Sequence, residues 1–350
     1  MACCTVALQE QQKKSVLWLW KLSTPLVDSS VPEWTAYTDV ENEIIEEAYQ
    51  QNKSEVILDD FHINFKRLFQ ISNTNKVEQQ HVKRITRDGN EKKVRENRFL
   101  PISISSLKAF ADDGSTFDYV DKVEENFKSF YCFDEELSRL KFIEAAAHGL
   151  LIEGKRAGKE REGEWMAQQL FNVKEGTAEE LYPVCARLYS MNSFLYRKMN
   201  ELMRLITDYT ADSKTVVDDS ISTFGPFIYL LASFYPPNGN SCKTVYRGAL
   251  LSDNMIDQFQ QACITKQIQS FPAFTSASRN RDVAEMYAGN VLFEIDIDWE
   301  GSDISPYSNF PDEEEVLIRN DFLFVVNSAL FDTTKKIWII HLESSNEPSI

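Results

Sequence analysis

Apolar residues recur along the chain with two different spacings, and the spacing changes once in the second half. Between residues 120 and 234 apolar positions return at helical intervals, which is typical of helices with one buried face. Beyond residue 244, short runs rich in Val, Ile and Phe predict strands. Helices followed by strands indicate an α+β fold rather than a parallel α/β sheet. The pattern predicts helices at 120–130, 135–151, 165–171, 193–209, 224–234 and 281–287, and strands at 244–246, 273–276, 291–297, 315–318, 322–326 and 336–342.

The first part of the chain mixes strand-like runs with one clear helix. Apolar spacing predicts this helix over Glu43–Gln51, and strands at 56–58 and 61–65. A turn signal, Arg87-Asp88-Gly89-Asn90, closes the segment. These features predict a small α+β domain at the start of the chain.

Two further regions follow this small domain. Residues 111–116 are typical of a loop or linker, and the charged, glycine-interrupted run 155–164 is expected in solvent. The pattern Thr177-Ala178-Glu179-Glu180 is a helix-capping box with Thr177 as N-cap. We therefore divide the chain at 10–90, at 91–176, to which no role is assigned, and at 177–345.

Composition narrows the class of protein. A net charge of −17 over 350 residues excludes general binding to nucleic acid, which needs clustered Lys and Arg. None of the six cysteines forms a C-x-x-C pair, so we expect no metal site. The start of the chain has no signal-peptide pattern, and apolar runs such as 227–234 are too short to cross a bilayer. We expect a cytoplasmic or nuclear protein with reduced thiols and no membrane span.

Two glutamates, Glu313 and Glu315, stand two residues apart at the predicted start of a strand. Because side chains alternate along a strand, both should point to one face, with Glu314 on the other. Two carboxylates on one face can divide labour, since one stabilises a developing positive charge while the other accepts a proton. Taken alone, the run is more typical of an acidic loop in solvent.

Two other motifs precede the glutamates. Arg247 ends a predicted strand and is followed by Gly248, so a guanidinium able to hold a diphosphate stands beside backbone that a ligand can approach. Ser276 and Ser278 flank an alanine on a short strand and should share a face. Taken alone, the arginine is more typical of a surface residue before a turn, and the serines could be edge-strand hydroxyls bonded to water.

In their order along the chain, Arg247, Ser276 and Glu315 resemble the catalytic set of the Arg-Ser-Glu class of mono-ADP-ribosyltransferases, in its arginine-specific branch. The resemblance runs from about residue 177 to 342. Within it, 188–204 is similar to the helical region ahead of that family's catalytic arginine, and 305–311 to the substrate-recognition loop ahead of its Glu-x-Glu. Agreement of several motifs in order makes the resemblance specific.

The resemblance implies two small β-sheets that form a cleft for NAD, with a helical part ahead of them. In such a site Arg247 would lie on the phosphates, and the Gly248 backbone would fix the nicotinamide amide. Ser276 would support the nicotinamide ribose and orient Glu315, with Ser278 in the same binding set. Arg279 or Arg281 would also reach the phosphates, although either is equally typical of a solvated helix start.

The resemblance also implies that the two glutamates have different catalytic roles. Glu315 would stabilise the oxocarbenium-like ribosyl cation that remains when nicotinamide departs. Glu313 would position the incoming guanidinium and help to take its proton. The expected partner is therefore an acceptor protein with an exposed arginine, and the expected co-substrate is NAD without a metal. A preference for NAD over NADP stays open.

The N-terminal segment resembles a WWE domain, through Trp18, Trp20, Trp34, the helical stretch 45–49 and the run 61–70. Such domains often bind ADP-ribose or the internal unit of its polymer, so ADP-ribose or ADP-ribosylated proteins are possible partners of this segment.

Carried over by motif, Gln70 and Arg84 would line the binding cleft of this domain. Gln80 stands where that family usually has an arginine on phosphate, which removes a charged donor. The alternative is that the tryptophans are core residues of a protein-binding module.

Two alternatives to arginine modification remain open. The chain could be an NAD glycohydrolase, in which water takes the place of arginine at Glu313. It could also be an inactive transferase fold that serves as an ADP-ribose or protein-binding module. The intact set of Arg247, Ser276, Glu313 and Glu315 argues against this second alternative.

Overall fold

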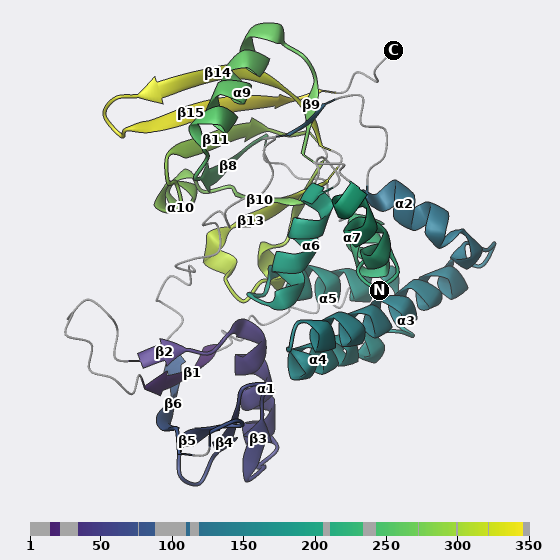
Figure 1. Cartoon of the computed structure of the whole chain (residues 1–350), viewed down its shortest axis with the longest axis vertical. Coiled ribbons are helices and arrows are strands. Elements are labelled where there is room, and N and C mark those ends of the chain that lie inside the picture. The colour runs from purple at the N-terminus through teal and green to yellow at the C-terminus, as the bar shows by residue number, and fades with distance from the viewer. Residues whose placement is uncertain are drawn as a thin grey trace, which may run out of the picture. The chain divides into compact units, whose positions relative to one another are not determined.

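The chain folds into two compact units, Met1–Lys92 and Lys93–Ile350 (Figure 1). The computed structural model describes residues 15–21, 34–75, 77–87, 110–112, 119–205, 211–233, 243–271, 273–298, 300–320 and 322–345. Within these ranges, no helix has the length and apolar content that a membrane crossing requires. The predicted turn at 88–90 and most of the predicted linker at 111–116 lie outside the described residues.

The first unit is a six-stranded antiparallel sheet with one helix packed on it. The helix α1 (Asp39–Gln50) begins four residues before the predicted start, because Thr38 and Glu41 form a capping box ahead of the apolar stripe. Ile45 and Ala48 of α1 are buried among side chains of the sheet. In sheet order the strands are β2 (Trp34–Ala36), β1 (Ser15–Lys21), β6 (Gln79–Arg87), β5 (Phe69–Ser72), β4 (Phe61–Asn64) and β3 (Glu55–Ile57).

The second unit begins with helices and ends mainly with strands, as the α+β prediction requires. The capping box at Thr177 is confirmed, since its side chain and that of Glu180 exchange bonds with each other's backbone. The prediction missed α7, whose apolar residues are sparse, and α9, although Met255, Ile256, Phe259 and Ala262 recur there at helical spacing. The helices are α2 (Tyr119–Asn126), α3 (Glu135–Arg156), α4 (Glu160–Asn172), α5 (Ala178–Ser190), α6 (Phe194–Leu205), α7 (Ala211–Ile221), α8 (Gly225–Ser233), α9 (Asp253–Thr265) and α10 (Arg281–Met286), with a 3₁₀ turn η1 (Lys128–Phe130).

The prediction that 155–164 lies in solvent is confirmed for most of its positions, and only Glu162 and Gly163 are buried. This stretch is the end of α3, a short turn and the start of α4, and Glu162 is only 2% exposed. A Cβ on Gly163 would lie 2.7 Å from the Leu150 carbonyl oxygen, and a Cβ on Gly154 would lie 2.9 Å from Gly163 Cα. The glycines are therefore there because two helices cross closely, not because the segment is a loop.

The strands of the second unit form a nine-stranded sheet, in which a single pair of residues joins β10 to β8. The order is β12-β13-β10-β8-β11-β15-β14-β9-β7, and β10 meets β8 only at Ser278 and Tyr246. The two small sheets expected from the sequence correspond to the parts on either side of this pair. The strands are β7 (Ala111–Asp112), β8 (Thr244–Ala249), β9 (Gln269–Ser270), β10 (Thr275–Ser278), β11 (Val291–Asp296), β12 (Gly301–Asp303), β13 (Glu315–Ile318), β14 (Leu323–Asp332) and β15 (Ile337–Ser344), with 3₁₀ turns η2 (Ser305–Tyr307) and η3 (Pro311–Glu313).

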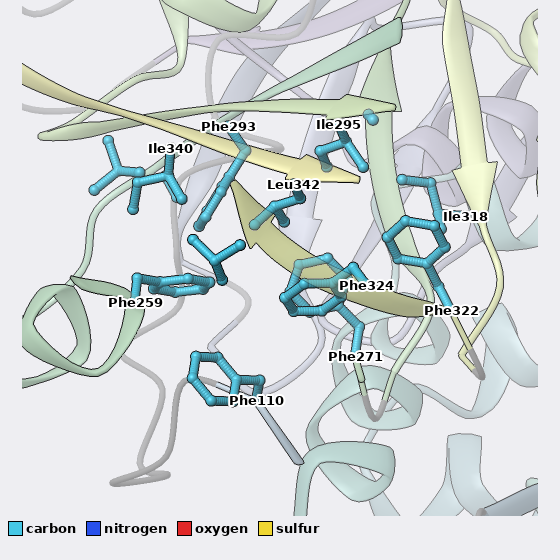
Figure 2. Packing of buried hydrophobic residues seen from close by; sticks show 14 of the residues in the cluster. Phe110, Phe259, Phe271, Phe293, Ile295, Ile318, Phe322, Phe324, Ile340 and Leu342 are labelled. Atoms are coloured by element: carbon cyan, nitrogen blue, oxygen red, sulfur yellow. The ribbon is translucent and has the colours of Figure 1, made fainter. Parts of the chain in front are cut away.

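A phenylalanine-rich core fixes the larger of these two parts. Figure 2 shows Phe259 of α9 near Phe293 of β11, and their ring centroids are 5.1 Å apart. Phe271 and Phe324 lie 4.6 Å apart in the same core. Aromatic rings bury large apolar areas, so this cluster holds β8 and β11 rigidly from one side. Strand β8, which carries Arg247, therefore stands on a well-packed support.

Candidate active site

Arg247 and Ser276 are brought together where β8 and β10 meet. The guanidinium of Arg247 is half-buried, and its Nη1 donates a 2.5 Å hydrogen bond to the backbone oxygen of Ser276. Because β8 and β10 share only one register pair, this side-chain bond adds a second link at the junction. Two predicted catalytic residues, 29 positions apart in sequence, therefore lie in direct contact.

The two serines of β10 share a face but have different surroundings. Both are 1% exposed. The hydroxyl of Ser278 donates to the Glu313 backbone oxygen at 2.7 Å and accepts from the Asn280 backbone N–H at 2.9 Å. Among the described residues, the Ser276 hydroxyl oxygen is buried without a hydrogen-bond partner. A buried polar atom of this kind is costly, which is typical of a group that meets a ligand.

Glu313 and Glu315 are both fully buried, at 0% exposure, but they do not lie on one strand as predicted. Glu313 ends the 3₁₀ turn η3, and only Glu315 lies on the strand β13. Glu314 between them adopts a left-handed backbone with φ of 47°, so strand alternation does not apply. Ser278 stands opposite Glu315 in the β10–β13 ladder, which places Ser276 diagonally beside Glu315 on the same face.

Gly248 has a structural reason for lacking a side chain. A Cβ at this position would lie 2.3 Å from the Ala284 carbonyl oxygen and 2.5 Å from the Ala288 nitrogen. Helix α10 therefore packs directly on β8 at this point, and only glycine permits the contact. The predicted role of its backbone in fixing nicotinamide stays a prediction.

Arg279 and Arg281 have carboxylate partners in the structure. Arg281 bonds Glu285 at 2.8 Å and Glu294 at 2.6 Å, and these contacts raise its pKa. Arg279 pairs with Asp303 and donates to the Ser305 hydroxyl at 3.1 Å. The predicted phosphate contacts would require either guanidinium to exchange these partners.

Three residues near the site carried no sequence signal. Tyr246 stands opposite Ser278 across the junction, and the Arg281 guanidinium lies 5.6 Å from the centroid of its ring. The Asn280 side chain caps α10 and also donates to the Glu314 carboxylate at 3.2 Å. Asp303 joins Arg279 from β12. Single polar residues without a characteristic spacing can be found only from the three-dimensional contacts.

Gln70 and Arg84, the candidate ADP-ribose-binding residues, form hydrogen bonds with other side chains of the first unit. Gln70 is 1% exposed, accepts from the Tyr37 hydroxyl at 2.5 Å and donates to Gln80. Arg84 holds Glu46 through two bonds, of 2.9 and 2.7 Å. Gln80 and Arg84 stand four positions apart on β6, or about 13 Å along the strand. Gln70 and Arg84 therefore share a face of the sheet without meeting in one contact.

Trp18 belongs to the core of the first unit. It is 0% exposed, and its indole N–H donates at 2.9 Å to Glu46 Oε2, the oxygen that also accepts from Arg84 Nε. Hydrogen bonds from Arg84, Gln50 and Trp18, with the Arg84 charge, lower the pKa of Glu46 although burial acts to raise it. For Trp18 the core interpretation is confirmed.

A sequence model of the family "NAD:arginine ADP-ribosyltransferase" matches residues 148–349, more than half of the chain. The chain belongs to this family. The family's reaction is transfer of ADP-ribose from NAD, so NAD is the co-substrate. The matched range begins inside α3, so the helices ahead of the strands are part of the family's sequence pattern.

A second sequence model, of the WWE domain, matches residues 16–84. This range coincides with the first unit, from β1 to near the end of β6. The predicted WWE domain is thus confirmed. A search of curated proteins gave no match to the chain.

Several solved bacterial ADP-ribosyltransferases and effectors are similar to this ADP-ribosyltransferase at low identity. HopU1 of Pseudomonas syringae pv. tomato DC3000 is 17% identical with a TM-score of 0.40, over 61% of this chain and 99% of that one. XopAI of Xanthomonas axonopodis pv. citri is 18% identical with a TM-score of 0.43, over 65% and 94%. The Vis toxin of Vibrio splendidus is 19% identical with a TM-score of 0.36, over 58% and 85%.

The transferase residues fit a bound NAD in two respects. The buried Ser276 hydroxyl lacks a partner among the described residues, and a ribose hydroxyl is a suitable one. The Arg247 guanidinium is half-buried beside it, and a guanidinium binds phosphate oxygens well. In the part of the chain that the structure describes, no three His, Cys, Asp or Glu side chains converge as metal ligands. That the reaction proceeds without a metal stays a prediction.

Proposed function

We propose that this ADP-ribosyltransferase modifies arginine side chains of acceptor proteins, releasing nicotinamide. The observation that carries the proposal is the Ser278 contact. The Ser278 hydroxyl donates to the Glu313 backbone oxygen, and Ser278 pairs with Glu315 in the β10–β13 ladder. One residue of β10 therefore holds both glutamates beside Ser276. Arg247 reaches the same strand through the Ser276 carbonyl.

The two buried carboxylates support distinct roles. Glu315 lies on a strand directly beside the serines, where its negative charge can stabilise the positive charge that develops on the ribose. Glu313 ends the 3₁₀ turn η3, and the left-handed residue Glu314 separates it from Glu315. On this loop the Glu313 carboxylate can orient a guanidinium. A carboxylate matches the planar fork of a guanidinium bidentately, and it can take the proton that arginine loses as the new C–N bond forms.

The acidic character of the chain supports a cationic acceptor. With a net charge of −17, the protein attracts basic surfaces more strongly than acidic ones. Arginine-rich segments combine positive charge with the guanidinium that Glu313 is placed to bind. This long-range attraction weakens as salt is added, which makes it separable from the chemistry.

The test combines nicotinamide release with intact mass of an acceptor peptide. With NAD and an arginine peptide, wild type should release nicotinamide and add ADP-ribose to the peptide, but not to a matched lysine peptide. Glu313→Gln should lower transfer by about 100-fold or more while nicotinamide release without acceptor persists. Glu315→Gln should lower both.

Other outcomes point to the alternatives. Free ADP-ribose without any adduct indicates an NAD glycohydrolase. No nicotinamide release indicates a binding module. Equal modification of the lysine peptide contradicts arginine as the acceptor, and unchanged transfer in Glu313→Gln contradicts the role of that residue.

We further propose that the protein works in the cytoplasm or nucleus, with its WWE domain binding ADP-ribose or ADP-ribosylated protein. Among the described residues, Cys132, Cys185 and Cys263 are free thiols, which is typical of a reducing compartment. Calorimetric titration of the chain with ADP-ribose tests the second part. Binding that is abolished by Gln70→Ala supports it, and absence of binding favours a protein-binding module.

A further inference from the structure

Arg279 joins three points of the chain that lie far apart in sequence. Its guanidinium pairs with Asp303 at the end of β12 and donates to the Ser305 hydroxyl at 3.1 Å. Its Nε lies 3.9 Å from the Glu314 carboxylate, and its backbone N–H donates to the Glu314 oxygen at 3.1 Å. We call Arg279, Asp303, Ser305 and Glu314 the Arg279 cluster.

The cluster closes a loop that contains both 3₁₀ turns and ends at Glu314, one residue after Glu313. Asp303 and Ser305 stand at the start of this loop, and Glu314 at its end. The Asp303 carboxylate also accepts from the Ser305 backbone N–H at 3.0 Å, which fixes the first turn of η2. One side chain thus ties both ends of residues 303–314 to the residue that follows β10.

The neighbouring contacts act on the same loop. Ser278 bonds the Glu313 oxygen at 2.7 Å, and the Asn280 amide bonds the Glu314 carboxylate at 3.2 Å. Together with Arg279, these residues attach the end of the loop to β10 over three successive positions. Because Glu313 is 0% exposed, the position of this part of the loop decides how an acceptor reaches it.

We propose that Arg279 is a positioning residue that holds the loop 303–314 so that Glu313 meets the acceptor guanidinium, and that it does not bind the phosphates of NAD. The proposal rests on the proposed function, since it assigns Glu313 to the acceptor. It separates Arg279 from Arg281, whose partners Glu285 and Glu294 lie on α10 and β11 and not on the loop.

Paired variants test the proposal by kinetics. Arg279→Met removes the charge and keeps the length of the side chain. The KM for an arginine peptide should rise about tenfold or kcat of transfer should fall to a similar extent, while the KM for NAD and nicotinamide release without acceptor change less than about threefold. Arg279→Lys, which can still pair with one carboxylate, should recover part of the loss.

Two further variants give the matched comparison. Asp303→Asn removes the same ion pair from the loop side, so it should change the kinetics as Arg279→Met does. The double variant should lose no more transfer activity than either single variant. Arg281→Met removes an arginine two positions away and should leave the KM for the arginine peptide unchanged. If Arg279→Met instead raises the KM for NAD about tenfold with the acceptor KM unchanged, Arg279 is a phosphate ligand and the proposal is overturned.

Limited proteolysis measures the loop without any substrate. Chymotrypsin cleaves after aromatic residues that proline does not follow, and Tyr307, followed by Ser308, lies inside the loop. Cleavage after Tyr307 should be several-fold faster in Arg279→Met than in wild type or Arg281→Met. Equal rates would overturn the positioning role. If wild type transfers nothing to arginine, the proposed function fails, and the proteolysis still decides whether Arg279 holds the loop.

Discussion

Ser276 and Ser278 form a matched pair of side chains on which the interpretation of the active site can be tested. They lie two positions apart on β10, share a face and are both 1% exposed. The Ser278 hydroxyl makes two hydrogen bonds, to Glu313 and from Asn280, while that of Ser276 has no partner among the described residues. Replacing each by alanine removes the same atom from two different environments.

The expected changes in stability have opposite signs. Ser278→Ala removes two hydrogen bonds, each of which contributes about 1–1.5 kcal/mol. We expect Ser278→Ala to destabilise the second unit by about 2–3 kcal/mol, which lowers its Tm by roughly 4–12 °C. Ser276→Ala removes a buried hydroxyl that is already unpaired, so it should leave Tm unchanged or raise it by a few degrees, at about 2–4 °C per kcal/mol.

The assay compares scanning calorimetry of the NAD-free variants with their rates of nicotinamide release. Ser276→Ala should lower kcat/KM for NAD by about tenfold or more, the equivalent of one hydrogen bond to substrate. A Tm for Ser276→Ala that falls as far as that of Ser278→Ala would refute the reasoning, because it would show that the Ser276 hydroxyl is bonded in the free protein. Full activity in Ser276→Ala would refute its assignment to the substrate.

Two other predictions concern packing and pH. Gly248→Ala places a Cβ 2.3 Å from the Ala284 oxygen, so calorimetry should show a loss of about 3 kcal/mol. Gly289→Ala makes a milder clash, 2.8 Å from the Cβ of the exposed Leu250, so it should cost less, and equal losses would contradict the argument. The pKa of Glu46 is lowered by Arg84 and its other donors against the effect of burial, so its contribution to stability is present above the unfolded pKa of about 4.3 and is lost as pH falls through the lower, folded value. Thermal unfolding of the first unit between pH 6 and 3 should therefore be less pH-dependent in Glu46→Gln, and an unchanged pH profile would disprove this.

The sequence predicted elements well where burial on one face imposes a period. The strand at 315–318 has the predicted bounds, and the capping box at Thr177 was recognisable because a threonine and a glutamate three residues apart have one structural use. Charge density correctly predicted a mostly exposed run at 155–164, but not the close helix crossing through Gly154 and Gly163. Charge density along a sequence does not reveal which backbone atoms approach each other.

The candidate site shows the same limit. Residue types and order were enough to select Arg247, Ser276 and Glu315, because few reactions use that set. The left-handed backbone at Glu314 could not be foreseen, since no pattern signals a positive φ at a glutamate. The contacts of Arg279 could not be predicted from the sequence either, because its partner Asp303 lies 24 positions away, in a strand that the sequence did not predict.

The arrangement of the site has a thermodynamic consequence for substrate binding. In the part of the chain that the structure describes, the Ser276 hydroxyl is buried without a hydrogen-bond partner, which costs free energy in the absence of ligand. A ligand that satisfies the hydroxyl recovers part of this cost, so NAD should stabilise the second unit beyond the effect of its apolar contacts. Because Ser276→Ala relieves the cost in the free protein, the same variant should also respond less to NAD. Stability of the free enzyme and affinity for the co-substrate are therefore coupled, with opposite signs, through one side chain.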